Sequence, residues 1–174
     1  MITNAIISFL GENKPNLISN ITSYLTDLGG EFSGVTFATL GRVCELTMVY
    51  QKPENLELDQ IKQGLEDLES TKNGEFQIKA LESYADAGPT TKITHRIVLS
   101  GEDQKGLLNK VIETLDDNNA LIVRMNTEKI TFPDKVQYIC RFAISIREEN
   151  APQCLSQMVK VAGNFDDAFT KSLD

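Results

Sequence analysis

The chain has 174 residues, of which 41% are apolar and 24% are charged, a composition typical of a folded globular protein. No apolar run reaches the roughly 18 residues of a membrane-spanning helix, and no basic region precedes the short apolar run at the N-terminus, so neither a membrane span nor a secretory signal is expected. Three cysteines without C-x-x-C spacing, Cys44, Cys140 and Cys154, indicate buried thiols in the reducing cytoplasm.

The net charge of −8 is unevenly distributed along the chain. Residues 1–89 contain six Lys and Arg against 13 Asp and Glu, whereas residues 90–174 contain 11 against 12. Nucleic-acid binding depends on basic side chains that neutralise phosphates, and the sequence has no run of Lys and Arg. Direct binding to DNA or RNA is therefore not expected.

The first half of the chain alternates between strand and helix patterns. A nearly continuous apolar run over 3–10 predicts a buried strand. The segment 32–50 alternates with a period of two, which predicts a hairpin that turns at Gly41–Arg42. A last strand is expected after the turn Asn73–Gly74. The positions with helical spacing are Leu17, Ile21, Leu25 and Leu28 before the hairpin, and Leu58, Ile61, Leu65 and Leu68 after it.

Glycine and proline mark the ends of these elements. Pro15 is expected in the first turn of the first helix, which Gly29–Gly30 ends. Val35 and Phe37 are expected on the same side of the first hairpin strand. Acidic residues fill the remaining faces of the second helix and predict a solvated surface there.

The second half repeats this order of elements. Within its hairpin, apolar residues alternate with polar ones along the second strand, so one face of that strand is expected to be buried. The segment 165–173 fits either a last strand or a short helix. The other predicted segments are a strand at 93–99, a helix at 107–115, a hairpin at 121–147 that turns at Pro133–Asp134, and a helix beyond Pro152.

One motif occurs twice, 90 residues apart, as Gly11 to Ile18 and as Gly101 to Leu108. From these starts, 22 aligned positions keep five identities. A repeat of this length is a whole small domain. The stretch between the two copies that is rich in glycine, proline, serine and threonine has linker character. The predicted domains are 1–84 and 92–174, joined by a linker at 85–91.

Two β-α-β-β-α-β units, each with such a turn between its first strand and first helix, resemble tandem ACT domains, a family of small regulatory ligand-binding modules. The family's turn has the pattern D-x-P-G-L/I. The second copy, Asp103 to Leu107, keeps the acid and the glycine, whereas the first copy, Asn13 to Leu17, keeps the proline but neither of these. The resemblance covers nearly the whole chain. It implies an α+β fold of two ferredoxin-like domains, each an antiparallel sheet with helices on one face.

A turn that leads into a helix is suited to bind an amino acid. The first residues of a helix present unpaired N–H groups and the positive end of the helix dipole, which attract a carboxylate. Asp103 is then the partner for the ammonium group, and Gly106 allows close approach to the backbone. The alternative is that these residues act only as helix N-caps. The candidate ligand-binding residues are Glu102, Asp103, Gln104, Lys105, Gly106 and Leu107 in the second copy, and Glu12, Asn13, Lys14, Pro15, Asn16 and Leu17 in the first.

A free-standing pair of ACT domains of this length is most similar to the bacterial glycine cleavage repressor family. That resemblance implies a cytoplasmic transcription regulator that binds an amino acid, with glycine as the candidate, and that contacts a DNA-binding activator rather than DNA. Because the family builds its pockets between neighbouring domains, a homodimer or a tight pair of domains is also implied. No cofactor, metal motif or catalytic group is predicted, and His95 is the only histidine.

Two other functions share this order of strands. An acylphosphatase-like enzyme needs an arginine in the first turn, and neither turn contains one. An RNA-binding module places aromatic residues on its sheet face, but Tyr138 and Phe142 lie on the continuous apolar side of their strand. Both alternatives are weaker than a regulatory binding module.

Overall fold

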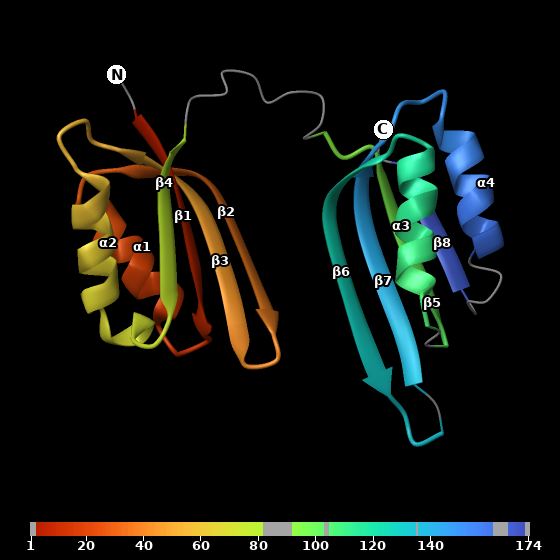
Figure 1. Cartoon of the computed structure of the whole chain (residues 1–174), viewed down its shortest axis with the longest axis horizontal. Helices are drawn as coiled ribbons and strands as arrows, with labels where there is room; N and C mark the ends of the chain where they lie inside the picture. Colours follow the sequence, from red (N-terminus) through yellow and green to blue (C-terminus); the bar gives the residue numbers. More distant parts are fainter. Residues whose placement is uncertain (1–2, 82–91, 103–104, 135, 162–166, 173–174) are drawn as a thin grey trace. The chain divides into compact units, whose positions relative to one another are not determined.

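The chain divides into two compact units, Met1–Ala85 and Asp86–Asp174 (Figure 1). The predicted linker at 85–91 lies outside the described residues, so its role stays a prediction. In this computed structural model the described residues are 3–81, 92–102, 105–134, 136–161 and 167–172.

The first unit has the predicted order β-α-β-β-α-β, with a short 3-10 turn that the sequence did not indicate. Its four strands form a sheet in the order β2-β3-β1-β4, and every neighbouring pair is antiparallel. The elements are β1 (Thr3–Glu12), α1 (Leu17–Asp27), β2 (Glu31–Leu40), β3 (Val43–Lys52), α2 (Leu58–Asp67), the 3-10 turn (Glu69–Thr71) and β4 (Glu75–Leu81).

The second unit has the equivalent sheet, in the order β6-β7-β5-β8 and again antiparallel. Its last element is a strand, which decides between the two alternatives for 165–173. The elements are β5 (His95–Glu102), α3 (Leu107–Asp117), β6 (Leu121–Thr131), β7 (Val136–Ser145), α4 (Ala151–Val161) and β8 (Asp167–Ser172). Both units therefore have the predicted ferredoxin-like fold.

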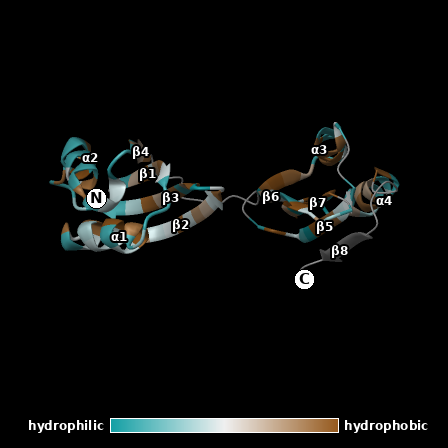
Figure 2. Ribbon diagram, turned by 90° about the horizontal axis from the view of Figure 1, so that it is seen from below, coloured by the Kyte–Doolittle hydropathy of each residue, from teal (hydrophilic) through white to brown (hydrophobic). Residues whose placement is uncertain are grey.

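Each core lies between one face of the sheet and its two helices. The hydrophobic parts of strands and helices face one another, while the outer side of α2 is hydrophilic (Figure 2). In the first unit, alternate residues of β3 meet the helical positions Ile21, Leu25, Ile61 and Leu65. The inward residues of β3, each at most 1% exposed, are Cys44, Leu46, Met48 and Tyr50. The predicted period-two pattern is confirmed for this strand.

Tyr50 joins the sheet to α1. Its hydroxyl donates a hydrogen bond of 2.8 Å to the carbonyl oxygen of Leu25, and its ring is fully buried. The ring passes so close to Gly30 that a Cβ added there would overlap it. Gly30 therefore does more than end the helix, because it leaves the room that the tyrosine ring occupies.

One local expectation was wrong, and one confirmed expectation has an unexpected feature. Pro15 does not lie in the first turn of α1, since the helix begins at Leu17 after the N-cap residue Asn16. Val35 and Phe37 lie on the same side of β2, as predicted, opposite inward residues of β3 in the register, yet their exposed fractions are 48% and 40%. The reason is that β2 is an edge strand, and the two helices do not fully cover its inward side.

Substitution of Gly30 tests the contact with Tyr50. We expect Gly30→Ala to lower the free energy of unfolding by about 1–3 kcal/mol, because the buried, hydrogen-bonded ring cannot move away from the added methyl group. Gly34→Ala is the matched control, since nothing lies within 4 Å of a Cβ at that position. Urea denaturation followed by circular dichroism measures both variants, and equal stability would show that the ring adjusts freely.

Candidate functional site

The two turns between first strand and first helix have the same backbone geometry. Asn16, with φ 62° and ψ 10°, is the N-cap of α1, and Gly106, with φ 80° and ψ 3°, is the N-cap of α3. Both residues are in the left-handed region, which glycine and asparagine tolerate best. The shared pattern of glycine or asparagine is therefore explained by the backbone conformation.

This geometry bears on two expectations about the turns, while the predicted close approach of a ligand to Gly106 stays a prediction. A Cβ at Gly106 would meet nothing within 4 Å in its own unit, so the glycine is needed for its positive φ rather than for space within the unit. Asn16 is the N-cap residue of α1, as the alternative interpretation predicts, but its side chain makes no cap hydrogen bond. Asp103 lies outside the described residues, and its role in the turn stays a prediction.

The first turn is fixed by two loops that are distant in sequence. The N–H of Asn13 donates to the carbonyl oxygen of Arg42, in the β2–β3 turn, at 3.1 Å. Lys14 Nζ donates to the carbonyl oxygen of Lys72, before β4, at 2.9 Å. The ammonium group of Lys14 therefore already has an acceptor within the unit. Sequence reasoning predicted these two turns but missed their contacts with the first turn, because no local pattern reports contacts between segments this far apart.

The start of α1 presents free backbone donors. The N–H of Leu17 donates to the carbonyl oxygen of Lys14 at 3.2 Å, and the regular helix bonds begin with Asn20, which donates to Asn16. For the N–H groups of Ile18 and Ser19, no acceptor is found among the described residues. Unpaired donors at a helix start carry partial positive charge. The first turn can thus attract a carboxylate.

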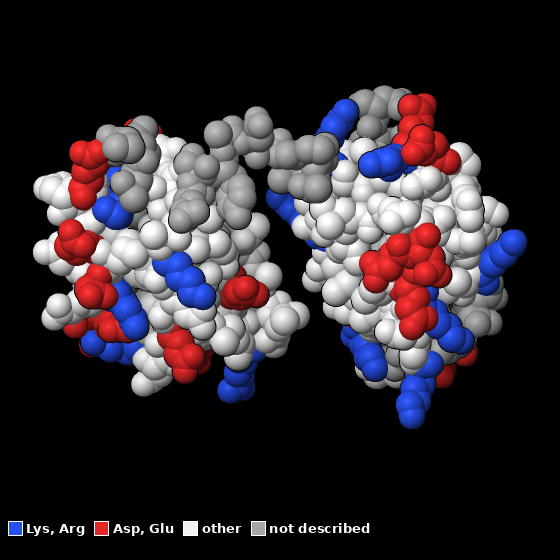
Figure 3. All heavy atoms as spheres, turned by 45° about the horizontal axis from the view of Figure 1, so that its top comes forward, with Lys and Arg blue, Asp and Glu red and all other residues white. Residues whose placement is uncertain are grey.

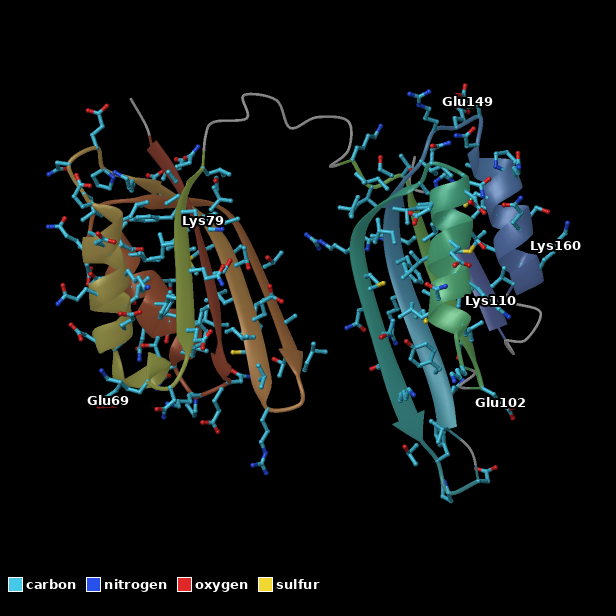
Figure 4. The ribbon with its side chains drawn as sticks, viewed as in Figure 1. Glu69, Lys79, Glu102, Lys110, Glu149 and Lys160 are labelled. Atoms are coloured by element: carbon cyan, nitrogen blue, oxygen red, sulfur yellow. The ribbon has the colours of Figure 1, made fainter. Side chains whose placement is uncertain are left out.

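Most of the described candidate ligand-binding residues are exposed to solvent, but the two leucines are buried. Glu12 and Glu102 are exposed at the ends of β1 and β5, and Glu102 lies close to the start of α3 (Figure 4). Leu17 and Leu107 are 1% and 3% exposed, so they anchor the helices in the cores and do not face a ligand. Pro15, Lys105 and Gly106 are exposed. Asp103 and Gln104 lie outside the described residues.

Several kinds of chemistry have no support in the described part of the chain. All three cysteines are buried, and burial raises the pKa of the Cys44, Cys140 and Cys154 thiols, so they are poor nucleophiles at neutral pH. His95 Nδ1 lies 3.1 Å from the hydroxyl of Thr94. Among the described residues, no group of His, Cys, Asp or Glu could hold a metal ion. None of the described helices is long and apolar enough to cross a membrane.

Comparison with solved structures defines the class of fold. No protein-family model and no curated protein matches the sequence. An unknown protein from Galdieria sulphuraria, 14% identical, aligns over 100% of both chains with a TM-score of 0.82. Such a similarity shows the fold, which is a tandem of two ferredoxin-like units.

A second similar structure is that of a protein with a described function. It is that of a candidate glycine cleavage system transcriptional repressor, which is 13% identical and aligns with a TM-score of 0.70. The alignment covers 100% of this chain and 99% of the repressor. The chain is thus similar in fold to this repressor over both units.

The left-handed turn residue gives a direct test of the shared geometry. We expect Gly106→Val to lower the free energy of unfolding by about 1–2 kcal/mol or more, because a β-branched residue is strained at positive φ. Gly106→Asn is the control and should cost less than about 1 kcal/mol, since asparagine tolerates this region and Asn16 adopts it in the first unit. Thermal unfolding of the two variants measures the difference. Equal losses would show that φ is not the constraint.

Proposed function

We propose that the chain is a regulatory protein that binds an amino acid at its strand-to-helix turns. We further propose that it acts as a repressor of the glycine cleavage type, through contact with a DNA-binding activator. The observation that carries the proposal is the pair of left-handed turns, each opening a helix whose N-cap residue, Asn16 or Gly106, makes no side-chain cap bond. The fold similarity to the candidate repressor over both units supports it.

The proposed binding mode uses both ends of the ligand. The carboxylate is held by the N–H groups at the helix start, which in the first unit are those of Ile18 and Ser19. The ammonium group is held by a carboxylate beside the turn, for which Asp103 is the candidate in the second unit. The first unit has Asn13 at the equivalent position. We therefore propose that the second turn is the stronger site.

We also propose that the protein is a homodimer and that neighbouring units complete the sites. An exposed edge strand tends to pair with another strand. Val35 and Phe37 leave apolar surface on the inward side of β2, and Met125, 48% exposed, occupies the equivalent side of β6. A partner unit placed at either edge would bury these side chains.

Sedimentation equilibrium tests the proposed dimer. The unmodified protein should be dimeric, and Phe37→Glu should weaken association by about tenfold or more, because burial of one large apolar side chain contributes roughly 1.5–3 kcal/mol. Val159→Glu is the matched control, since Val159 is 59% exposed on α4 and belongs to neither β2 nor β6. A monomer at all concentrations would contradict the proposal, and equal weakening by both variants would contradict the role of β2.

A thermal-shift panel of the twenty amino acids tests ligand binding. A ligand that binds only the folded protein adds about 2.7 kcal/mol of stability at 100 times its dissociation constant, so the true ligand should raise the unfolding temperature clearly. We expect glycine or a closely related amino acid to do so. A panel without any stabilising amino acid would argue against a sensor function.

Asp103→Ala shows where the ligand found in that panel binds. Loss of one hydrogen bond to a charged group should weaken binding by roughly 1.5–3 kcal/mol. Asn13→Ala is the matched control in the first turn and should change the affinity less. Isothermal titration calorimetry measures both variants, with circular dichroism as the test of folding. Gly106→Val is a poor probe here, because its strained backbone would also alter stability.

A further inference from the structure

An arginine pair lies on the face of the second sheet that is turned away from α3 and α4, which we call the outer face. Ala143 of β7 pairs with Arg96 of β5 on one side and with Arg124 of β6 on the other. Inward neighbours such as Ile97 and Phe142 are buried under the helices, so these three residues point outward. Both arginines are exposed. The sheet thus places two guanidinium groups on either side of one small residue.

A register shift in β6 produces this arrangement. Ile122 pairs with Ile144 on the inward side, and the register changes between Ile122 and Arg124. Because side chains alternate between faces, an extra residue moves everything after it to the opposite face. Without the shift, Arg124 would point toward the core. The irregularity therefore brings Arg124 to the same face as Arg96.

Neither arginine of this pair has an acidic partner among the described side chains. Arg141, one row along the outer face, forms an ion pair with Glu128. No carboxylate among the described side chains forms an ion pair with Arg96 or Arg124. Ala143 is only 4% exposed although the helices lie on the other face, as expected if the aliphatic stems of the arginines lie over it. Basic side chains project from the second unit on the side of β6 (Figure 3).

The first unit shows that the fold does not require these arginines. Its equivalent row consists of Ile6, Val49 and Gly34, paired in the same way across β1, β3 and β2. The same fold is therefore built without an arginine at these three positions, although Lys79 of β4 pairs with Ile6 at the end of the row. In a chain of net charge −8, two neighbouring exposed arginines that form no ion pair with a described carboxylate occur at this row of the second unit and not on the equivalent three strands of the first. This difference points to a contact specific to the second unit.

We infer that the arginine pair, Arg96 and Arg124, is the contact surface for an acidic face of a protein partner. The planar guanidinium group suits paired hydrogen bonds to carboxylates. Two strand spacings separate the arginine backbones by about 10 Å, a distance similar to that between residues seven apart on a helix, about 10.5 Å. An acidic helix with carboxylates two turns apart matches this spacing. Nucleic acid is the less suitable occupant, because the rest of the chain is strongly acidic and would repel phosphates.

This inference rests on the proposed function, in which the partner is the DNA-binding activator. The experiment is calorimetric titration of the full chain with the purified glycine cleavage activator of the same organism, at about 50 and 300 mM salt. We expect the double variant Arg96→Gln with Arg124→Gln to bind about tenfold more weakly or worse, with a smaller dependence on salt. Arg96→Lys with Arg124→Lys should keep most of the salt dependence but lose part of the affinity.

A control with the same change of net charge separates a local contact from a general charge effect. Lys79→Gln with Lys160→Gln removes two exposed positive charges, one on β4 of the first unit and one on α4, on the helix side of the second (Figure 4). This variant should bind the activator as the unmodified chain does. Circular dichroism and amino-acid binding should be unchanged in all variants, which shows that they are folded.

The possible failures are distinguishable. If the unmodified chain does not bind the activator, the proposed function fails, and the assignment of this partner to the arginine pair fails with it. If the chain binds and the Gln variant binds equally well, the proposed function survives and the assigned surface is wrong. If the chain alone binds an operator DNA duplex and the Gln variant does not, the occupant is nucleic acid and the inference is overturned.

Discussion

The packing of two amphipathic helices on one face of a four-stranded sheet is the interaction on which each unit depends. Burial of that face fixes which residues of every strand point inward, as the row of buried residues in β3 and β7 shows. It also leaves two surfaces free, the outer face of the sheet and the inward side of the edge strands β2 and β6. The proposed contacts with partners use these free surfaces, because the fold places no demand on them.

The same packing determines the geometry of the proposed ligand site. Leu17 and Leu107 are buried in the cores, so the helices must begin at fixed points below the ends of β1 and β5. The chain reaches those points through a residue in the left-handed conformation, Asn16 or Gly106. As a result, neither helix start is closed by a hydrogen bond from the side chain of its N-cap residue. The constraint on the backbone and the proposed function therefore lie in the same residues.

The duplicated architecture provides an internal comparison. Features present in both units, such as the left-handed turn, are needed for the fold or for a function that both units have. Features present in only one unit are free to serve a separate purpose. Lys14 donates a hydrogen bond to the loop before β4 in the first unit, and the arginine pair is found in the second. We infer that the two units have divergent roles, with ligand binding and partner contact both stronger in the second.

The sequence by itself determined the order of the elements, the position of the hairpins and the two turns. These follow from hydrophobic periodicity and from glycine, asparagine and proline, which act through the local backbone. Only the tertiary structure decided the exposure of Val35 and Phe37, the support of the first turn by Lys72, and the placement of Arg96 and Arg124 on the same face of the sheet. The physical reason is that edge position and strand register depend on pairing between distant segments. The register shift after Ile122 in particular changes the face of Arg124, and no local pattern in the sequence reports it.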